Sequence, residues 1–310
     1  MAYYLGIDGG GSKTTCAVGD ETSLLALVVA GPSNITRVGE ARARESLHRA
    51  IGQACAEAKI DARQLSRACV GAAGAGRERI ASVVRSMVAE LIPGNVEVVG
   101  DMEIALQAAL GTGPGVIVIA GTCSIAYGRD AQRKTARAGG WGFAISDEGS
   151  AQWIGRAAVG GVLRAVDEPT CHREAEAAPQ LFHEIKSVWK IESVEELARA
   201  ANSTSDFAVL FPAVLAAADY GDELARQVLA QAARELARLA RIVLVRLSPE
   251  RPEPGAAVPL AMAGGVFRHS PVIRELFYND VRAAHPQVVL KSEVVEPVHG
   301  ALQLARRAAS

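Results

Sequence analysis

Apolar positions in the first third of the chain predict strands separated by helices. Three short runs rich in β-forming residues come first, at 3–7, 14–18 and 24–30. Apolar residues then recur every three or four positions over 40–59, which predicts an amphipathic helix. The other elements predicted up to residue 110 are strands at 68–71 and 96–99 and helices at 77–91 and 103–110.

A glycine-rich break at 111–115 separates this region from a second one, in which strand, glycine turn and strand occur again. Residues 150–247 are predicted to be mostly helical, with a proline-rich loop at 249–259 after them. The remaining predicted elements are strands at 116–120, 125–127, 258–263 and 288–291 and helices at 223–247, 271–284 and 298–307. The alternation predicts an α/β fold, and the opening hairpin makes its sheet mixed rather than parallel.

Composition narrows the class of protein without identifying it. The 310 residues allow two domains, and 49% hydrophobic with 22% charged residues is an ordinary globular mixture. The net charge of −1 lacks the basic excess typical of nucleic-acid binders, so no nucleic-acid partner is expected.

The five cysteines point to a reducing compartment. Their number is odd, they are widely spaced and they form no C-x-x-C pair, so neither a disulfide framework nor a zinc site is expected. The first residues lack the pattern of a signal peptide, and no apolar run approaches the length of a membrane span. We therefore expect a cytoplasmic protein that does not bind membranes.

The first glycine-rich segment, DGGGSKT at 8–14, directly follows a predicted strand. Its glycines leave backbone N–H groups open to a ligand, and Asp8 can hold a hydrated Mg²⁺ against bound phosphates. The segment lacks the Walker A spacing and is predicted to lead into a strand. It is therefore a candidate phosphate loop, with an ordinary hairpin turn as the alternative.

Two other glycine turns also follow predicted strands, GTCS at 121–124 and AGGV at 263–266. Together with DGGGSKT, the first suggests two turns that face each other across a cleft and offer amides and hydroxyls to phosphate oxygens. In the second, the backbone of Gly264 and Gly265 can contact a nucleotide base or ribose. A second hairpin and a tight turn are the alternatives.

Tryptophan lies among glycines in GGWG at 139–142, in a loop that can line a pocket, and DEGS follows at 147–150. Carboxylates and amides can bind the hydroxyls of a polyhydroxyl ligand while Trp141 packs on its apolar face. Asp147 and Glu148 are also predicted to open a helix, so the alternative is that Asp147 only caps it.

Asp101 follows Gly100 at the end of a predicted strand and opens a helix. A carboxylate in this position can accept the proton of a substrate hydroxyl as a general base. A helix N-cap is again the alternative, and the local sequence does not separate the two.

Taken in order, these segments resemble the BadF/BadG/BcrA/BcrD ATPase family. The segments that carry the resemblance are DGGGSKT (8–14), GPSN (31–34), GD (100–101), GTCS (121–124), GGWG (139–142), DEGS (147–150) and AGGV (263–266). It implies two duplicated, ribonuclease H-like (actin-like ATPase) α/β domains, with mixed five-stranded sheets around a central cleft. The expected domains are 1–111 and 112–310, with a helical insertion at 150–247 and a final helix, 297–308, that packs back on the first.

The resemblance also implies roles for individual residues. Asp101 matches the catalytic base, Asp8 lies near Mg²⁺, and Cys123 stands where the second phosphate loop usually has glycine. The residues matching positions that bind ATP are Gly9, Gly10, Gly11, Ser12, Lys13, Thr14, Gly121, Thr122, Ser124, Gly264 and Gly265. Those matching positions that hold the sugar are Asn34, Asp101, Gly140, Trp141 and Asp147.

The activity implied by the resemblance is that of an ATP-dependent hexosamine kinase acting on the 6-hydroxyl of N-acetylglucosamine or glucosamine. Glucose and N-acetylmuramic acid stay open as substrates, and a homodimer is suggested by analogy alone. One alternative within the family is an ATPase activator of acyl-CoA dehydratases or reductases, which binds an iron–sulfur cluster through cysteines. Another is a sugar- or nucleotide-sensing regulator, for which the expected additional DNA-binding segment has no room before Tyr3.

Overall fold

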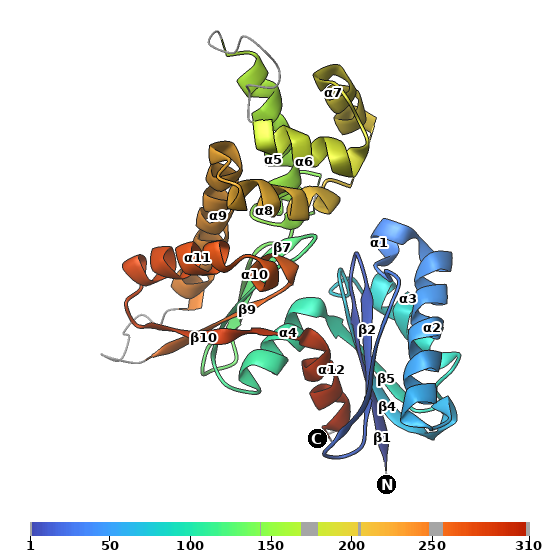
Figure 1. Cartoon of the computed structure of the whole chain (residues 1–310). Helices are drawn as coiled ribbons and strands as arrows, with labels where there is room; N and C mark the ends of the chain where they lie inside the picture. The colour runs from blue at the N-terminus through green and yellow to red at the C-terminus, as the bar shows by residue number, and fades with distance from the viewer. Residues whose placement is uncertain (1, 143, 169–178, 204–205, 248–256, 308–310) are drawn as a thin grey trace. The chain divides into compact units, whose positions relative to one another are not determined.

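The structure is a computed structural model that describes residues 2–142, 144–168, 179–203, 206–247 and 257–307 (Figure 1). Its internal contacts divide the chain into two compact units. The first comprises Met1–Ile117 and Val295–Ser310, and the second comprises Val118–Val294.

The first unit is built on a mixed five-stranded sheet in the order β3-β2-β1-β4-β5. β1, β2 and β3 pair antiparallel, whereas β4 and β5 join parallel to β1. The strands are β1 (Tyr3–Gly9), β2 (Thr14–Gly19), β3 (Leu24–Ala30), β4 (Leu65–Ala72) and β5 (Asn95–Gly100). The helices are α1 (Ile35–Val38), α2 (Glu40–Ala58), the 3-10 turn η1 (Ala62–Gln64), α3 (Glu78–Ala89), α4 (Asp101–Leu110) and α12 (Pro297–Arg306).

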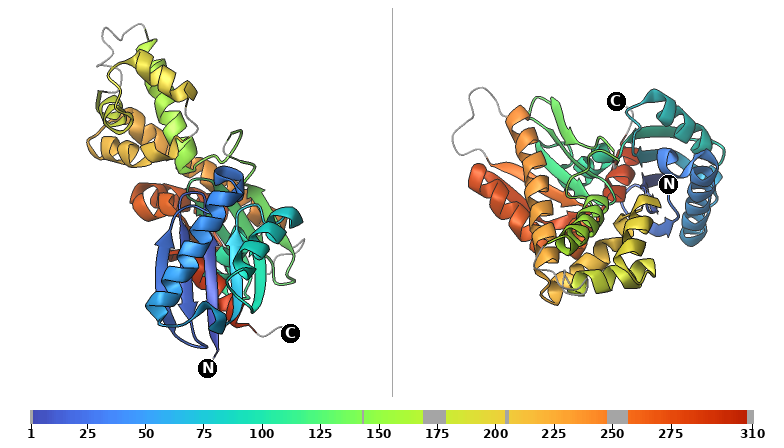
Figure 2. Two further views of the ribbon diagram at one scale, coloured as in Figure 1. Left: turned by 90° about the vertical axis from the view of Figure 1, so that its right-hand side faces the viewer. Right: turned by 90° about the horizontal axis from the view of Figure 1, so that it is seen from above.

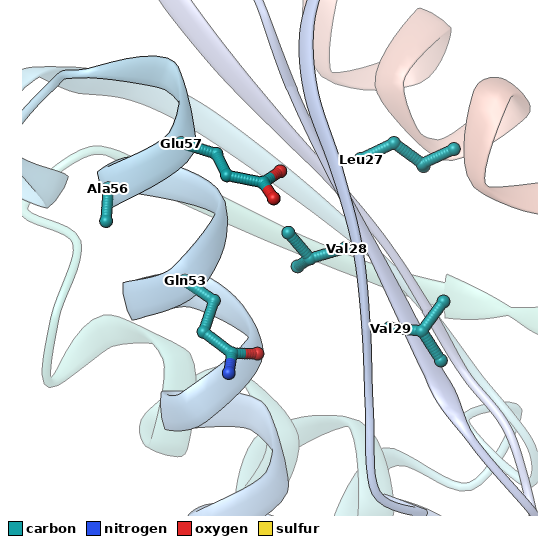
Figure 3. Close-up of a pocket in the computed structure, with 6 residues that line it drawn as sticks. All are labelled: Leu27, Val28, Val29, Gln53, Ala56 and Glu57. Carbon is teal, nitrogen blue, oxygen red and sulfur yellow. The ribbon is translucent and has the colours of Figure 1, made fainter.

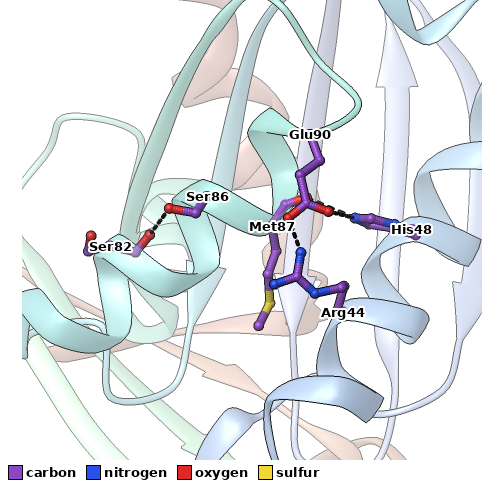
Figure 4. A network of polar contacts seen from close by, with 6 residues as sticks. All are labelled: Arg44, His48, Ser82, Ser86, Met87 and Glu90. Carbon is purple, nitrogen blue, oxygen red and sulfur yellow. Dashed lines mark hydrogen bonds and ion pairs between the residues drawn. The ribbon is translucent and has the colours of Figure 1, made fainter.

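Helices α2 and α3 cover one face of this sheet. Their buried apolar residues, which include Leu47, Ile51 and Met87, pack in one core with β1 and β4. At the surface an ion pair between Arg44 and Glu90 joins the two helices, and His48 Nε2 donates to the Met87 carbonyl oxygen at 2.9 Å (Figure 4). The orientation of α2 is therefore fixed by apolar and polar contacts together.

Helix α12 packs on the opposite face of the sheet, against β1 and α4 (Figure 1). Two glycines permit this close approach. A Cβ on Gly6 of β1 would lie 2.4 Å from the Leu302 backbone nitrogen, and one on Gly300 would lie 1.9 Å from the Ile104 carbonyl oxygen. Side chains at both positions are therefore excluded, and the last helix of the chain is held against the first strand.

The second sheet also has five strands, in the order β10-β9-β6-β7-β8. Figure 2 shows the long helix α9 and helix α11 side by side along it. Its strands are β6 (Gly115–Ala120), β7 (Ser124–Arg129), β8 (Thr135–Gly139), β9 (Val258–Ala263) and β10 (Val288–Val295). The helices are α5 (Ala151–Val166), α6 (Pro179–Trp189), α7 (Val194–Ser203), η3 (Ala208–Leu210), α8 (Phe211–Asp219), α9 (Glu223–Leu247), α10 (Gly265–His269) and α11 (Pro271–Ala284).

The α/β class and the two five-stranded sheets confirm the predicted fold. Strand β8 is absent from the sequence prediction because TARAG lacks the β-branched and aromatic run that marks a strand. The predicted proline-rich loop at 249–259 lies largely outside the described residues. No helix in the described parts of the chain is long and apolar enough to cross a membrane.

Candidate active site

The predicted first phosphate loop is a tight turn between β1 and β2. The Gly10 N–H donates to the Lys13 carbonyl oxygen at 3.0 Å, and Gly10 O accepts from the Ser33 and Asn34 N–H groups, both at 3.2 Å. A Cβ on Gly10 would lie 2.8 Å from Lys13 O, so the turn requires glycine there. Ser12 and Lys13 are exposed at its tip. The turn thus presents backbone and a positive charge to solvent.

Thr14, at the start of β2, has a structural contact in this turn. Its hydroxyl is fully buried and lies 2.7 Å from both the Gly31 carbonyl oxygen and the Ser33 hydroxyl. One hydroxyl can donate once, so Thr14 bonds to Gly31 and can accept from Ser33. These bonds fasten the GGGSKT turn to the GPSN segment.

Asn34 of that segment caps the short helix α1. Its Oδ1 accepts from the Thr36 N–H at 3.1 Å and from the Thr36 hydroxyl at 2.6 Å. The carboxamide oxygen is therefore used within the protein, which leaves the NH₂ group as the part that can donate to a ligand.

Three carboxylates gather at the carboxyl end of β1. Burial raises the pKa of Asp8 to about 7, with smaller increases from the charges of Asp101 and Glu296 and a partial offset by Lys13. Asp101 comes from the start of α4, and Glu296 immediately precedes α12. The first unit therefore brings together the predicted metal-site residue and the predicted base.

Asp101 is the first residue of α4 rather than its cap. The cap position belongs to Gly100, whose N–H donates to Glu103 Oε1 at 3.1 Å. One oxygen of the Asp101 carboxylate accepts from the Met102 N–H at 2.9 Å, and the side chain is only partly buried. The N-cap alternative for Asp101 is wrong, because a glycine and a capping glutamate serve the helix end instead.

Replacing Asp8 by asparagine is expected to stabilise the metal-free protein at about pH 8.5 by ~1–3 kcal/mol, and by much less near pH 5. The raised pKa means that between 3.8 and about 7 the native state retains a proton that the unfolded state has released. The free energy of unfolding of the wild type therefore falls as pH rises through this interval. That of Asp8→Asn does not, because asparagine does not titrate. Thermal unfolding with a chelator, using the exposed Asp219→Asn as control, measures the difference. A gain independent of pH would contradict the assigned pKa.

The second predicted phosphate loop joins β6 to β7 and is bonded to the DEGS segment. Gly121 N–H donates to Cys123 O at 2.9 Å, and Gly121 O accepts from Ala151 N–H at 2.8 Å. The buried Ser124 hydroxyl donates to Glu148 O at 2.8 Å. The two segments therefore form one rigid corner, and the Ser124 side chain is engaged inside it.

Gly264 brings the AGGV turn to the same corner. It has φ of +99°, and a Cβ there would lie 2.3 Å from Ala120 O and 3.0 Å from Gly121 N. Only glycine lets the backbone of this turn lie so close to the second phosphate loop. Helix α10 begins at Gly265, directly after this contact.

Asp147 is a buried carboxylate of the second unit with poorly satisfied oxygens. It is 1% exposed, and neither carboxylate oxygen makes a hydrogen bond of standard geometry with any described residue. Burial raises its pKa, and the nearby Cys123 thiol and the N–H groups of Gly142 and Ser124 offset this only in part. Its φ of +66° is rare for a residue other than glycine. A buried carboxylate whose nearby donors are poorly aligned, on backbone that residues other than glycine rarely adopt, indicates a ligand position.

Helix α5 does not begin at Asp147 and Glu148 as predicted. It begins at Ala151, and the Ser150 side chain caps it by accepting from Trp153 N–H at 3.2 Å. The N-cap alternative for Asp147 is therefore wrong, because Ser150 already fills that position.

The GGWG loop lies beside this corner. A Cβ on Gly140, which has φ of +69°, would lie 2.7 Å from the Ile125 side chain. Trp141 is 67% exposed, and the Arg137 guanidinium lies 4.6 Å from its ring centroid. The ring is thus held by a cation–π contact on one face, with much of its surface open to a ligand.

Each unit thus carries its own set of candidate residues. The first holds the GGGSKT turn, Asn34, Asp8 and Asp101, and the second holds GTCS, GGWG, DEGS and AGGV. Among the described residues no group of three histidines, cysteines or carboxylates could enclose a metal ion.

Sequence reasoning assigned no role to Glu296, although its charge acts on Asp8. It also missed Ser33, which links GPSN to Thr14. The signal for Glu296 is its place before Pro297, since proline is favoured in the first turn of a helix and the residue before it lies at the helix start. Nothing local in the sequence marks the contact of Ser33.

Comparison with known proteins is consistent with this arrangement. The sequence model of the BadF/BadG/BcrA/BcrD ATPase family matches residues 5–305. An N-acetylmuramic acid/N-acetylglucosamine kinase of Clostridium acetobutylicum is 32% identical over 99% of both chains. An N-acetyl-D-glucosamine kinase of Dictyostelium discoideum is 29% identical over 97% of both chains. A crystal structure assigned as an N-acetylglucosamine kinase from Chromobacterium violaceum shares the fold, with a TM-score of 0.77, 24% identity and coverage of 98% of this chain and 99% of that one.

Proposed function

The chain belongs to the BadF/BadG/BcrA/BcrD ATPase family, and we propose that it is an ATP-dependent hexosamine kinase. The proposed reaction transfers the γ-phosphoryl group of ATP to the 6-hydroxyl of N-acetylglucosamine or glucosamine. The observation that carries it is the carboxylate of Asp147, which is buried, makes no hydrogen bond of standard geometry with a described residue, and supplies acceptors for sugar hydroxyls at a corner where three glycine turns meet. The names of the relatives above support the same sugar class.

In the first unit we assign the proton transfer to Asp101. One of its oxygens accepts from the Met102 N–H, so the carboxylate is oriented, and an ionised carboxylate can accept the proton of the 6-hydroxyl. Phosphoryl transfer needs mainly positioning and charge stabilisation, and a fixed base supplies the former. Mg²⁺ bound beside Asp8 would supply positive charge to the β- and γ-phosphates.

Backbone amides are the proposed phosphate ligands. Gly11 and the exposed Lys13 would bind from the first turn and Thr122 from the second, because the N–H groups of Gly10 and Gly121 already donate to Lys13 O and Cys123 O within their turns. The backbone of Gly10 and Gly121 would let the phosphates approach closely. A Cβ at Gly121 would meet no atom within 4 Å, so this position is open to a close ligand. Gly264 and Gly265 would contact the adenosine.

The remaining assignment concerns the sugar. Asp147 would accept from two hydroxyls, and Trp141 would pack on the apolar face of the ring, as aromatic rings commonly do in such pockets. Asn34 would donate from its NH₂ group, because its oxygen caps α1. The backbone at Gly140 would approach the sugar closely.

A coupled ADP-release assay over N-acetylglucosamine, glucosamine, glucose and N-acetylmuramic acid tests the proposal. We expect the highest kcat/KM with N-acetylglucosamine, and phosphorus NMR should place the new phosphate on the 6-oxygen. Reactions without sugar measure background ATP hydrolysis. ADP release that does not depend on any of the four sugars would overturn the kinase assignment.

The second candidate function is that of an acyl-CoA dehydratase activator. The burial of the cysteines argues against this function. Cys16, Cys55 and Cys69 are buried, and burial raises the pKa of Cys55 to about 11 and of Cys69 to about 12. Thiolates are the ligands of iron–sulfur clusters, so these side chains are poor candidates. Of the cysteines in the described ranges only Cys123 is exposed. Anaerobically purified protein that contains iron would favour the activator.

A further inference from the structure

The GGGSKT turn has a second cationic side chain beside it, which comes from helix α1. A Cβ on Gly11 would lie 3.5 Å from Arg37 Nη1 and 3.6 Å from Arg37 Cδ. These are ordinary van der Waals distances, so the guanidinium and the end of its aliphatic stem both lie along the turn. Arg37 is half-buried there, whereas Lys13 is exposed at the tip. Two positive charges from different segments thus flank the same glycine turn.

The segment that carries Arg37 is bonded to the turn by its backbone. Gly10 O accepts from the N–H groups of Ser33 and Asn34, and the Ser33 hydroxyl lies 2.7 Å from the buried hydroxyl of Thr14. The Arg37 N–H donates to Asn34 O at 3.0 Å, which places Arg37 one helical turn after Asn34. The base of the Arg37 side chain is therefore held next to the turn whether or not a ligand is bound.

The two cations act on different sides of the turn. Burial raises the pKa of Asp8, and the positive charge of Lys13 lowers it again in part, so Lys13 acts on the side where Asp8 lies. Arg37 lies along Gly11 and belongs to the helix that Asn34 caps. The NH₂ group of Asn34 is the proposed sugar donor in this unit. The Arg37 side chain therefore connects the helix of the proposed sugar donor with the proposed phosphate turn.

The apolar groove of the first unit is unsuited to phosphate. It has a volume of about 510 Å³ and lies between β3 and α2 (Figure 3). Three apolar residues of β3 line one wall, and Glu57 is the one charged side chain among the described residues that line it. A carboxylate repels phosphate oxygens. An anionic ligand of this unit is therefore expected at the GGGSKT turn, where backbone N–H groups and cations occur together.

We propose that Arg37 binds the γ-phosphoryl group of ATP while it is transferred, an assignment that rests on the kinase function proposed above. This group lies between the nucleotide and the sugar, as Arg37 lies between the turn and the helix of Asn34. A guanidinium presents its N–H donors in a fixed fork that matches two phosphate oxygens, and it keeps its charge throughout the neutral pH range.

The transfer defines what the guanidinium stabilises. The bond from the γ-phosphorus to the oxygen that bridges the β-phosphate breaks, and that oxygen leaves with the electron pair on ADP. A new bond forms from the sugar 6-oxygen to the γ-phosphorus, and the proton of the 6-hydroxyl passes to Asp101. Negative charge on the remaining γ-oxygens persists throughout, and a positioned cation lowers the cost of bringing the nucleophile to it. In this assignment Arg37 is a catalytic residue, because it touches the transferred group.

Calorimetric titration with ADP and with the β,γ-imido analogue of ATP tests the contact without turnover. Arg37→Met keeps an aliphatic stem against Gly11 and removes the charge. It should lower the affinity for the imido analogue by ~10–100-fold and change the affinity for ADP by less than about 2-fold. Arg63→Met is the matched control, since Arg63 is exposed before β4, at the opposite end of the sheet, and it should keep both affinities. An equal loss for both nucleotides, or no loss for either, would overturn the assignment.

Steady-state kinetics add a catalytic readout. The kcat of Arg37→Met with N-acetylglucosamine should fall by ~10²–10³-fold with little change in the sugar KM. Arg37→Lys should lie between Arg37→Met and the wild type, because an ammonium keeps the charge without the fork. Melting temperatures measured in parallel show that each variant is folded. A loss confined to N-acetylmuramic acid, whose carboxylate a guanidinium also binds, would place Arg37 at the sugar and overturn the proposal.

These measurements separate the role of Arg37 from the kinase assignment. If the wild type releases no ADP in response to sugar, the kinase assignment fails, and the titrations still decide whether Arg37 contacts the γ-phosphate. If the wild type phosphorylates a sugar and Arg37→Met does so at the same rate, with unchanged affinity for the imido analogue, only the role of Arg37 is overturned.

Discussion

Asp101→Asn is expected to lower kcat for sugar phosphorylation by ~10²–10⁴-fold while sugar binding changes little. Asparagine keeps the shape and can still accept from the Met102 N–H, so the start of α4 is preserved. What it loses is the ability to take a proton from the attacking hydroxyl. Steady-state kinetics and calorimetric titration with the sugar measure the two effects separately.

Glu40→Gln, at the exposed start of α2, is the control for the removal of one negative charge from a helix start. It should retain wild-type kcat. Normal turnover by Asp101→Asn would exclude Asp101 as the base, and an equal loss of binding and kcat would indicate a structural role.

Asp147→Asn should raise the sugar KM by ~10–100-fold and also stabilise the sugar-free protein. Asp147 is buried without standard hydrogen bonds, so its charge lowers stability in the free enzyme, and the same acceptors bind hydroxyls when sugar is present. Opposite effects on stability and affinity distinguish a binding residue from a structural one. Thermal unfolding with and without sugar, together with the KM, tests both.

The sign of the pH effect is fixed by the direction of the shift. Burial raises the pKa of Asp147, so the gain in stability from asparagine should be larger at alkaline pH and vanish where the carboxylate is protonated. The exposed Asp219→Asn should change neither stability nor KM. A destabilised Asp147→Asn with an unchanged KM would mean that the carboxylate supports the fold rather than the ligand.

The sequence predicted the parts of the fold that depend on local chemistry. The opening hairpins, the long helix α9 and the glycine turns follow from strong periodicity and from positions that only glycine tolerates, such as Gly10 and Gly264. The corner at Gly121 was not predictable in detail, because Ser124 bonds to Glu148, 24 positions away, and Gly121 bonds to Ala151, 30 positions away.

The exact N-cap residues of two helices could not be predicted from the local sequence. Asp101 and Asp147 both precede apolar periodic stretches, and both fit a capping role equally well in sequence. The structure gives the caps to Gly100 and Ser150, because backbone geometry rather than residue type decides which position is half inside the helix. The carboxylates of Asp101 and Asp147 are therefore not needed to cap these helices. The charge of Glu296 on Asp8 was likewise invisible, since almost the whole chain separates them.

The contact of α12 with β1 has a consequence for biosynthesis. Ala17, Tyr4 and Cys69 lie in small clusters with residues of α12, joined in one cluster by Ile104 of α4. The α12 residues are Val298, Ala301, Leu302 and Ala305. These α12 residues are translated after the whole second unit, Val118–Val294. The face of the first sheet that α12 covers is therefore completed only after the second unit has been made.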